Sequence, residues 1–199
     1  MSKMLTAKEP HPPGDFAIWI IIYVELLTFA LLFLGFAFSR RSNIEMFNAS
    51  QLQLDQISGF INTLILITSS YFVAKAVQSI KHMTDERIKE ASRAAARWLL
   101  FAIVSAGGFL VVKMLDFIHV FGQGITLSTN KFFMFYIMLT VFHFMHVLLG
   151  SFILTVLYRK TKEGGYTQND HKGLETGASY WHMVDLLWIV LFPLVYIIR

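Results

Sequence analysis

Five long runs of apolar residues, separated by short polar segments, dominate the chain. They cover about residues 16–39, 57–80, 97–119, 132–158 and 180–198. An α-helix needs ~20 apolar residues to cross a hydrocarbon core of ~30 Å, and each run is close to that length or longer. The pattern predicts an all-α integral membrane bundle of five transmembrane helices, with residues 16–199 as one membrane domain.

The polar segments predict where these helices begin and end. Residues 1–15 are polar and rich in proline, so we expect a disordered cytoplasmic tail, with Asp15 as the N-cap of the first helix. Residues 40–56 and 159–176 are interpreted as loops. Thr84, followed by Asp85 and Glu86, predicts that the third helix begins in water before it enters the membrane. Pro193 is expected to kink the last helix.

Composition supports a membrane protein. The 199 residues are 55% hydrophobic and 15% charged, and the mean hydropathy is +0.56, whereas about a quarter of the residues in soluble domains are charged. The absence of cysteine excludes disulfides, thiolate metal sites and iron–sulfur clusters. The pI of about 9.3 does not indicate nucleic-acid binding, because the basic residues lie in the predicted loops.

The same basic residues predict the orientation. Eleven Lys and Arg residues lie in the tail and in the second and fourth loops, whereas four lie in the other loops and at the C-terminus. Because positively charged loops stay in the cytoplasm, we expect a cytoplasmic N-terminus and an external C-terminus.

Several ionisable residues interrupt the apolar runs. The 1.5 Å rise per residue places most of them ~9 to 14 Å from the cytoplasmic boundary, on three helices. This predicted intramembrane cluster consists of Glu25, His143, His146, His182 and Asp185. Carboxylates beside histidines can hold or relay protons near neutral pH. Hydrogen bonds that fix the helix packing would explain the same residues, and we favour packing for all of them except Glu25.

Other polar side chains are interpreted as packing contacts. Small polar residues of the second apolar run can bond across helix interfaces; they are Ser58, Asn62, Thr63, Ser69 and Ser70. Lys113 and Asp116, near the outer boundary, are expected to form an intrahelical salt bridge. One face of the fourth run should meet other helices; it carries Tyr136, Thr140, His143, His146 and Gly150.

The sequence predicts no catalytic centre and no metal site in this chain. His143 and His146 lie on one side of one helix, so they cannot supply both axial ligands of a haem. A single metal shared by these two histidines and a carboxylate stays open. There is no Gly-rich phosphate loop and no Ser-His-Asp order that would suggest a nucleophile.

The last helix contains the pattern Tyr180-Trp181-His182-x-Val184-Asp185-x-x-Trp188, and the fourth run contains Thr140, His143, His146, Val147 and Gly150. The first pattern resembles the signature of subunit III of the haem-copper respiratory oxidases, and the second is similar to that family's histidine segment. Glu25 stands at the family's intramembrane glutamate, and Asn62-Thr63 also fits. Lys113 and Asp116 depart from the family's Gln and Glu. The five helices resemble the short form of the family, which lacks the first two of seven helices.

The resemblance implies a non-catalytic accessory subunit that binds no haem or copper, holds phospholipid and packs against a catalytic subunit with haem and copper or iron. Pro13-Gly14-Asp15-x-x-x-Trp19 and the segment 175–177 look most like the accessory protein encoded beside bacterial nitric oxide reductases. A multi-pass protein of the bacterial inner membrane is expected. The alternatives are subunit III of a cytochrome c or quinol oxidase, an independent proton or solute transporter centred on Glu25, and a membrane enzyme with one metal.

Overall fold

The computed structural model describes residues 13–82 and 88–198. These residues form α1 (Phe16–Arg41), α2 (Ile44–Gln51), α3 (Gln56–Lys81), α4 (Ile88–Gly122), α5 (Lys131–Lys162), α6 (Lys172–Phe192) and the π-helical turn η2 (Pro193–Ile197). Five of the helices are long and apolar enough to cross a membrane. The predicted all-α fold with five transmembrane helices is therefore confirmed.

Side-chain caps fix where several helices begin. The Asp15 carboxylate accepts a hydrogen bond from the Ala17 N–H at 3.2 Å, as predicted for the first helix. Asp55 caps α3 through the Ile57 N–H (2.9 Å), and Asn130 caps α5 through the Phe133 N–H (2.9 Å). Each cap satisfies a backbone donor that the helix itself leaves unpaired. Residues 1–12 of the expected tail, and the predicted cap Thr84 with Asp85 and Glu86, lie outside the described residues.

Two segments expected as loops contain helix. Residues 44–51 form α2, whose Phe47 is buried and packs edge-on against Phe36 (5.2 Å between centroids) and Phe132 (5.5 Å). In the segment 159–176, α5 continues to Lys162 and α6 begins at Lys172. The apolar runs mark only the part of a helix that meets lipid, because a helix continues into water wherever its residues still favour helical backbone.

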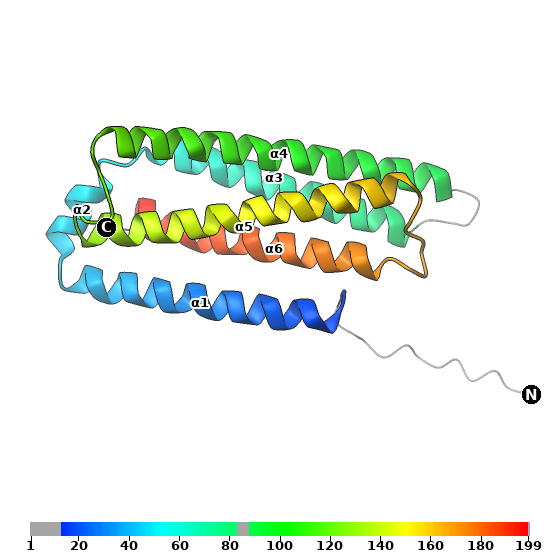
Figure 1. Cartoon of the computed structure of the whole chain (residues 1–199), viewed down its shortest axis with the longest axis horizontal. Helices are drawn as coiled ribbons and strands as arrows, with labels where there is room; N and C mark the ends of the chain where they lie inside the picture. Colours follow the sequence, from blue (N-terminus) through cyan, green and yellow to red (C-terminus); the bar gives the residue numbers. More distant parts are fainter. Residues whose placement is uncertain (1–12, 83–87, 199) are drawn as a thin grey trace, which may run out of the picture.

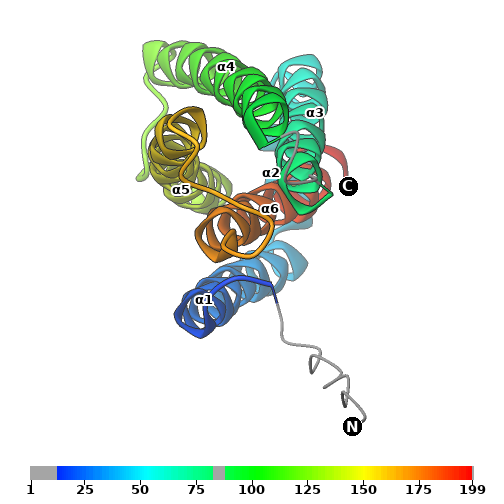
Figure 2. The same ribbon diagram turned by 90° about the vertical axis from the view of Figure 1, so that its right-hand side faces the viewer.

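The long helices lie side by side (Figure 1), and α2 lies across the end of the bundle where the chain ends. Seen from the end, α3, α4, α5 and α6 surround a common core, with α1 outside them against α6 (Figure 2). All five predicted packing positions of α5 are buried. The sequence therefore placed the inward face of that helix correctly.

A glycine brings α5 and α6 close together. A Cβ added to Gly150 would lie 2.8 Å from the ring of Trp181, which is too short for carbon atoms. The glycine therefore allows the fully buried Trp181 ring to lie on the backbone of α5. Small residues serve this purpose in membrane bundles, where dispersion contacts take over from the hydrophobic effect.

The last helix changes geometry at its proline. α6 ends at Phe192, and Pro193 begins η2, in which the Ile198 N–H reaches back to the Pro193 carbonyl (2.9 Å). Two side-chain amides donate hydrogen bonds to carbonyl oxygens of this turn. Gln51 donates to Val195 O (3.0 Å), and Gln56 donates to Tyr196 O (2.9 Å). At Pro193, where the sequence predicts a kink, the helix therefore widens into a π-helical turn that is hydrogen-bonded to α2 and α3.

Candidate functional site

Glu25 and His146 form an ion pair or hydrogen bond between α1 and α5. His146 Nε2 lies 3.0 Å from Glu25 Oε2. The other ring nitrogen, Nδ1, lies 2.8 Å from the Phe142 carbonyl oxygen. The rings of Phe29 (5.5 Å) and Phe142 (4.6 Å) flank the imidazole edge-on. Most of the pair is shielded, with 9% of the His146 side chain and 26% of the Glu25 side chain exposed.

The contacts of His146 limit where the protons of the pair can lie. A carbonyl oxygen only accepts hydrogen bonds, so His146 Nδ1 must carry a hydrogen. The 3.0 Å contact then needs one more proton, either on Nε2 of the imidazole or on the Glu25 carboxyl. The pair is either an imidazolium with a carboxylate or a neutral imidazole with a carboxylic acid. Moving one proton over a short distance converts one form into the other, so the pair has the chemistry of a proton-holding site.

His143 lies apart from this pair, although it is one turn away on α5. It is fully buried, and neither ring nitrogen has a hydrogen-bond partner in the described part of the chain. Its neighbours are aromatic: Trp188 at 5.2 Å, Phe109 at 5.9 Å and Phe29 at 6.4 Å between ring centroids. His143 therefore serves as a core ring between α4, α5 and α6.

His182 and Asp185 form a second polar group, on the interface of α3 and α6. His182 Nδ1 lies 2.5 Å from Ser70 Oγ, and one buried oxygen of Asp185 has no hydrogen-bond partner among the described residues. A cavity of about 310 Å³ reaches His182 from the basic end of the bundle, past the ion pair of Lys81 with Glu175 (2.6 Å). His182 is therefore the member of the predicted cluster that a cavity joins to the end of the bundle.

The predicted cluster thus divides into three places. Glu25 meets His146, His182 and Asp185 share the α3–α6 interface, and His143 lies in the aromatic core. No group of three or more His, Asp or Glu side chains in residues 13–82 and 88–198 is close enough to hold a metal ion. The shared metal that the sequence left open would need His143 beside Glu25 and His146, and the folded chain turns it toward Trp188 instead.

Lys113 lies in a further polar cluster, in which it has more partners than the expected salt bridge to Asp116. Its ammonium is fully buried and lies 3.5 Å from Asp116 Oδ2, and it donates to Tyr196 OH (2.7 Å) and Tyr136 OH (3.2 Å). Four aromatic rings lie within 5.7 Å of the ammonium; they belong to Phe117, Tyr136, Trp188 and Tyr196. Hydroxyl oxygens and ring faces replace the water that a lysine loses on burial.

Asp116 joins the same site to α3. Its Oδ1 accepts a hydrogen bond from Ser58 Oγ at 2.6 Å, while Oδ2 faces Lys113. Sequence reasoning found Lys113, Asp116 and Ser58 but missed Tyr196, which lies in η2. The one available signal was a tyrosine three positions after the proline in an otherwise apolar helix end. The predicted polar stripe of α3 also bonds to α4, since the Ser69 hydroxyl donates to Ala102 O (3.0 Å).

The aromatic residues of the last helix pack the bundle. Trp188 is fully buried and donates from Nε1 to Thr63 Oγ1 at 2.9 Å, which joins α6 to α3. Tyr180 and Trp181 are buried against Gly150 of α5. The signature segment that the sequence singled out is thus the part of α6 that contacts the other helices of the bundle, and its residues hold them together.

Known proteins match the sequence of this chain over almost its whole length. The family described as "Cytochrome c oxidase subunit III" matches residues 15–199. Cytochrome c oxidase subunit 3 of Thermostichus vulcanus is 30% identical over 199 residues, which cover 98% of this chain and 93% of the relative. Quinol oxidase subunit 3 of Bacillus subtilis is 24% identical over 185 residues, covering 90% and 84%.

Other relatives are longer. Cytochrome c oxidase subunit 3 of Synechocystis sp. is 35% identical over 149 residues, which are 73% of this chain but only 59% of that protein. The family match over residues 15–199, together with the buried Tyr180 and Trp181 of the α6 signature, leads to one conclusion: this chain is a multi-pass membrane protein of the cytochrome c oxidase subunit III family.

Proposed function

We propose that this chain is a non-catalytic accessory subunit of a membrane haem-copper respiratory complex. Its catalytic partner would carry the haem and the copper or iron. The family match supports this proposal, and relatives are named as third subunits of cytochrome c and quinol oxidases. In this role the chain would stabilise the catalytic subunit, hold membrane phospholipid against it or support its proton supply.

The observation that carries the proposal is how the ionisable side chains are used. Glu25 with His146 joins α1 to α5, and His182 with Ser70 joins α6 to α3. The Lys113–Asp116 pair of α4 bonds to Ser58 of α3, Tyr136 of α5 and Tyr196 of η2. Outside these joints, the long helices present large apolar side chains outward, such as Leu27 and Leu31 of α1. Such a surface suits lipid and the transmembrane helices of a partner.

Purification from native membranes tests the proposal. The full chain, extracted in a mild detergent with an affinity tag, should bring a haem protein with it in a fixed ratio. The same chain produced without its neighbours should show no haem absorption. Recovery of the chain without any haem protein, or tight haem binding by the isolated chain, would contradict an accessory role.

The catalytic partner is a cytochrome c oxidase, a quinol oxidase or a nitric oxide reductase. We infer a nitric oxide reductase, in bacterial denitrification, as the finer proposal, because the segment around Gly14 and Asp15 resembles the accessory protein of that system. In the structure this segment is fixed to α6: the Gly14 N–H donates to Glu175 (3.2 Å) and the Asp15 N–H donates to Thr176 Oγ1 (3.0 Å). Oxygen and nitric oxide consumption by the co-purified complex distinguishes the partners.

A different function, proton transport by this chain alone, is favoured by one observation. The Glu25 carboxylate lies 3.0 Å from His146 Nε2, and 26% of the Glu25 side chain is exposed on α1. Liposomes that contain only this chain should show proton flux if it is a transporter, and Glu25→Gln should abolish that flux. An accessory subunit predicts no flux above that of empty liposomes.

A further inference from the structure

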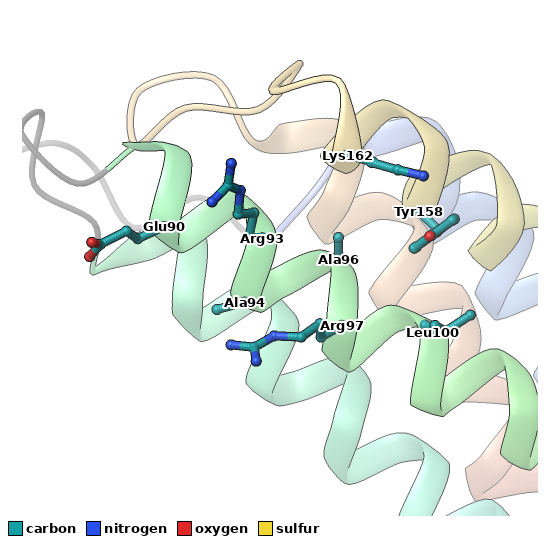
Figure 3. A pocket seen from close by; sticks show the side chains of 8 residues that line it. All are labelled: Glu90, Arg93, Ala94, Ala96, Arg97, Leu100, Tyr158 and Lys162. Carbon is teal, nitrogen blue, oxygen red and sulfur yellow. The ribbon is translucent and has the colours of Figure 1, made fainter.

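A basic cleft opens between α4 and α5, away from the clusters described above. It has a volume of about 690 Å³, within the range of ~300 to 1,000 Å³ typical of ligand pockets. Its lining, shown in Figure 3, consists of Glu90, Arg93, Ala94, Ala96, Arg97 and Leu100 of α4 with Tyr158 and Lys162 of α5. Every one of these residues lies at the end of the bundle where the positively charged loops gather.

The cleft carries more positive than negative charge. Arg93 and Arg97 lie one turn apart on α4, and Lys162 lies across from them on α5 (Figure 3). All three side chains are exposed, and among the described residues none of them is within salt-bridge distance of a carboxylate. The lining contains three cations and the single carboxylate Glu90, so a bound group that brings negative charge is favoured.

Below the charges the lining becomes apolar. Leu100 lies about one turn further along α4 than Arg97, and Ala94 and Ala96 add small apolar side chains to the lining between the two arginines. Tyr158 contributes an aromatic ring at the same depth, with the Lys162 ammonium 5.9 Å from its centroid. Tyrosines gather where membrane helices cross the headgroup region, and arginines just outside it pair with phosphate. Along the cleft, charged side chains are followed by an aromatic ring and then by an apolar side chain. A phospholipid presents its groups in the matching order, with a charged headgroup, a polar ester region and an apolar acyl chain.

We propose that this cleft binds the headgroup and upper acyl chain of an anionic phospholipid. Arg93 and Arg97 would pair with the phosphate and the anionic headgroup, Lys162 would approach from α5, and Leu100 would contact the acyl chain. This inference rests on the lipid association included in the proposed function and assigns it a place. A soluble phosphate compound would use the cations but would gain nothing from the apolar lower wall.

The purified chain, in detergent and without any partner subunit, is the sample for the test. Native mass spectrometry measures binding of phosphatidylglycerol and of phosphatidylcholine with identical acyl chains. We expect clear preference for phosphatidylglycerol. Because one basic residue near an anionic lipid surface contributes about fivefold in affinity, the double variant Arg93→Gln/Arg97→Gln should bind it roughly 10- to 30-fold more weakly.

Two further variants separate a built site from general attraction. Lys75→Gln/Lys172→Gln removes the same charge outside the cleft and should keep phosphatidylglycerol binding. Ala94→Phe keeps every charge but fills part of the cleft, so it should weaken binding as well. The melting temperature of each variant without added lipid shows whether it has folded, and the comparison is made only among folded variants; Arg93→Lys/Arg97→Lys, which keeps both charges, serves if the glutamine pair does not fold.

Several results would overturn the inference. They are equal binding of the two lipids, equal loss in the control pair Lys75→Gln/Lys172→Gln, full binding by Ala94→Phe, and displacement of the lipid by millimolar inorganic phosphate. None of these measurements involves a catalytic partner, so failure here leaves the co-purification test of the proposed function untouched.

Discussion

At the scale of single residues, buried charge is held by several partners at once. Lys113 is fully buried, yet a carboxylate, two phenol hydroxyls and four ring faces surround its ammonium. Asp116 in turn uses its second oxygen for Ser58. Removing one member of such a network leaves the others without partners in a medium that contains no water to replace them. The two predictions at this scale follow from this cost of removing one partner.

The first prediction concerns Asp116. Asp116→Leu leaves the Lys113 cation without its counterion, and breaking a buried pair in this way destabilises proteins by about 3 to 5 kcal/mol. The double variant Lys113→Met/Asp116→Leu removes both charges and should be more stable than the single variant. Thermal unfolding of the purified chain, followed by circular dichroism, measures the difference. A double variant that melts at or below the temperature of Asp116→Leu would contradict the role of the pair.

The second prediction compares the two polar groups of the intramembrane cluster. Glu25→Gln keeps a hydrogen bond to His146, because the amide N–H can donate to a neutral Nε2. Asp185→Leu instead replaces the carboxylate near His182 and Ser70 by an apolar side chain, so these polar groups lose a polar neighbour on the α3–α6 interface. The yield of assembled complex should therefore fall more for Asp185→Leu than for Glu25→Gln. Equal yields from membranes with equal expression would count against this order.

At the scale of the helices, close approach depends on a few small residues. Gly150 of α5 has no side chain, and the fully buried ring of Trp181 occupies the space that a side chain would need. By contrast, nothing lies within 4 Å of a Cβ added to Gly107 of α4. The two glycines are therefore a matched pair, one in a helix joint and one on an open helix face.

The third prediction uses that pair. Gly150→Ala should destabilise the purified chain by about 1 to 3 kcal/mol, because overpacking moves the Trp181 ring or separates the helices. Gly107→Ala should leave stability unchanged or raise it by up to about 1 kcal/mol, because alanine favours helical backbone more than glycine does. Melting temperatures of both variants test this. A similar response of the two would mean that the α5–α6 joint tolerates a wider spacing.

At the scale of the whole molecule, an odd number of transmembrane helices places the chain ends on opposite faces of the membrane. The five apolar helices support this arrangement, and the basic loops gather at the end that carries the α5–α6 connection. The bundle has α1 as an outer helix, held to α5 by the Glu25–His146 contact and to α6 through Gly14 and Asp15. A partner that binds α1 would therefore act on a helix attached by few polar contacts.

The fourth prediction concerns orientation. The chain has no cysteine, so single cysteines can be introduced as unique labels. Ser128→Cys, in the α4–α5 connection, should react with a membrane-impermeant maleimide in intact spheroplasts, whereas Asn169→Cys, in the α5–α6 connection, should react only after lysis. The positive-inside rule gives this order. If only Asn169→Cys were labelled in intact spheroplasts, the chain would have the orientation opposite to the predicted one.

The sequence by itself determined the fold class, the five spans, the inward face of α5 and the family signature. These features depend on local properties, since hydropathy marks each span and helical spacing decides which residues share a face. Within the apolar runs, the sequence also identified the polar residues that join helices, with the exception of Tyr196, because a polar group within an apolar run needs a partner.

Only the tertiary structure decided which of these residues meet. His143 and His146 are one turn apart, but one faces the aromatic core and the other faces Glu25. Lys113 finds Tyr196 across 83 positions of chain, and α2 folds within a segment whose polar residues suggested a loop. Depth along a helix follows from the rise per residue, whereas rotation and neighbours depend on how all the helices pack, which no single segment specifies.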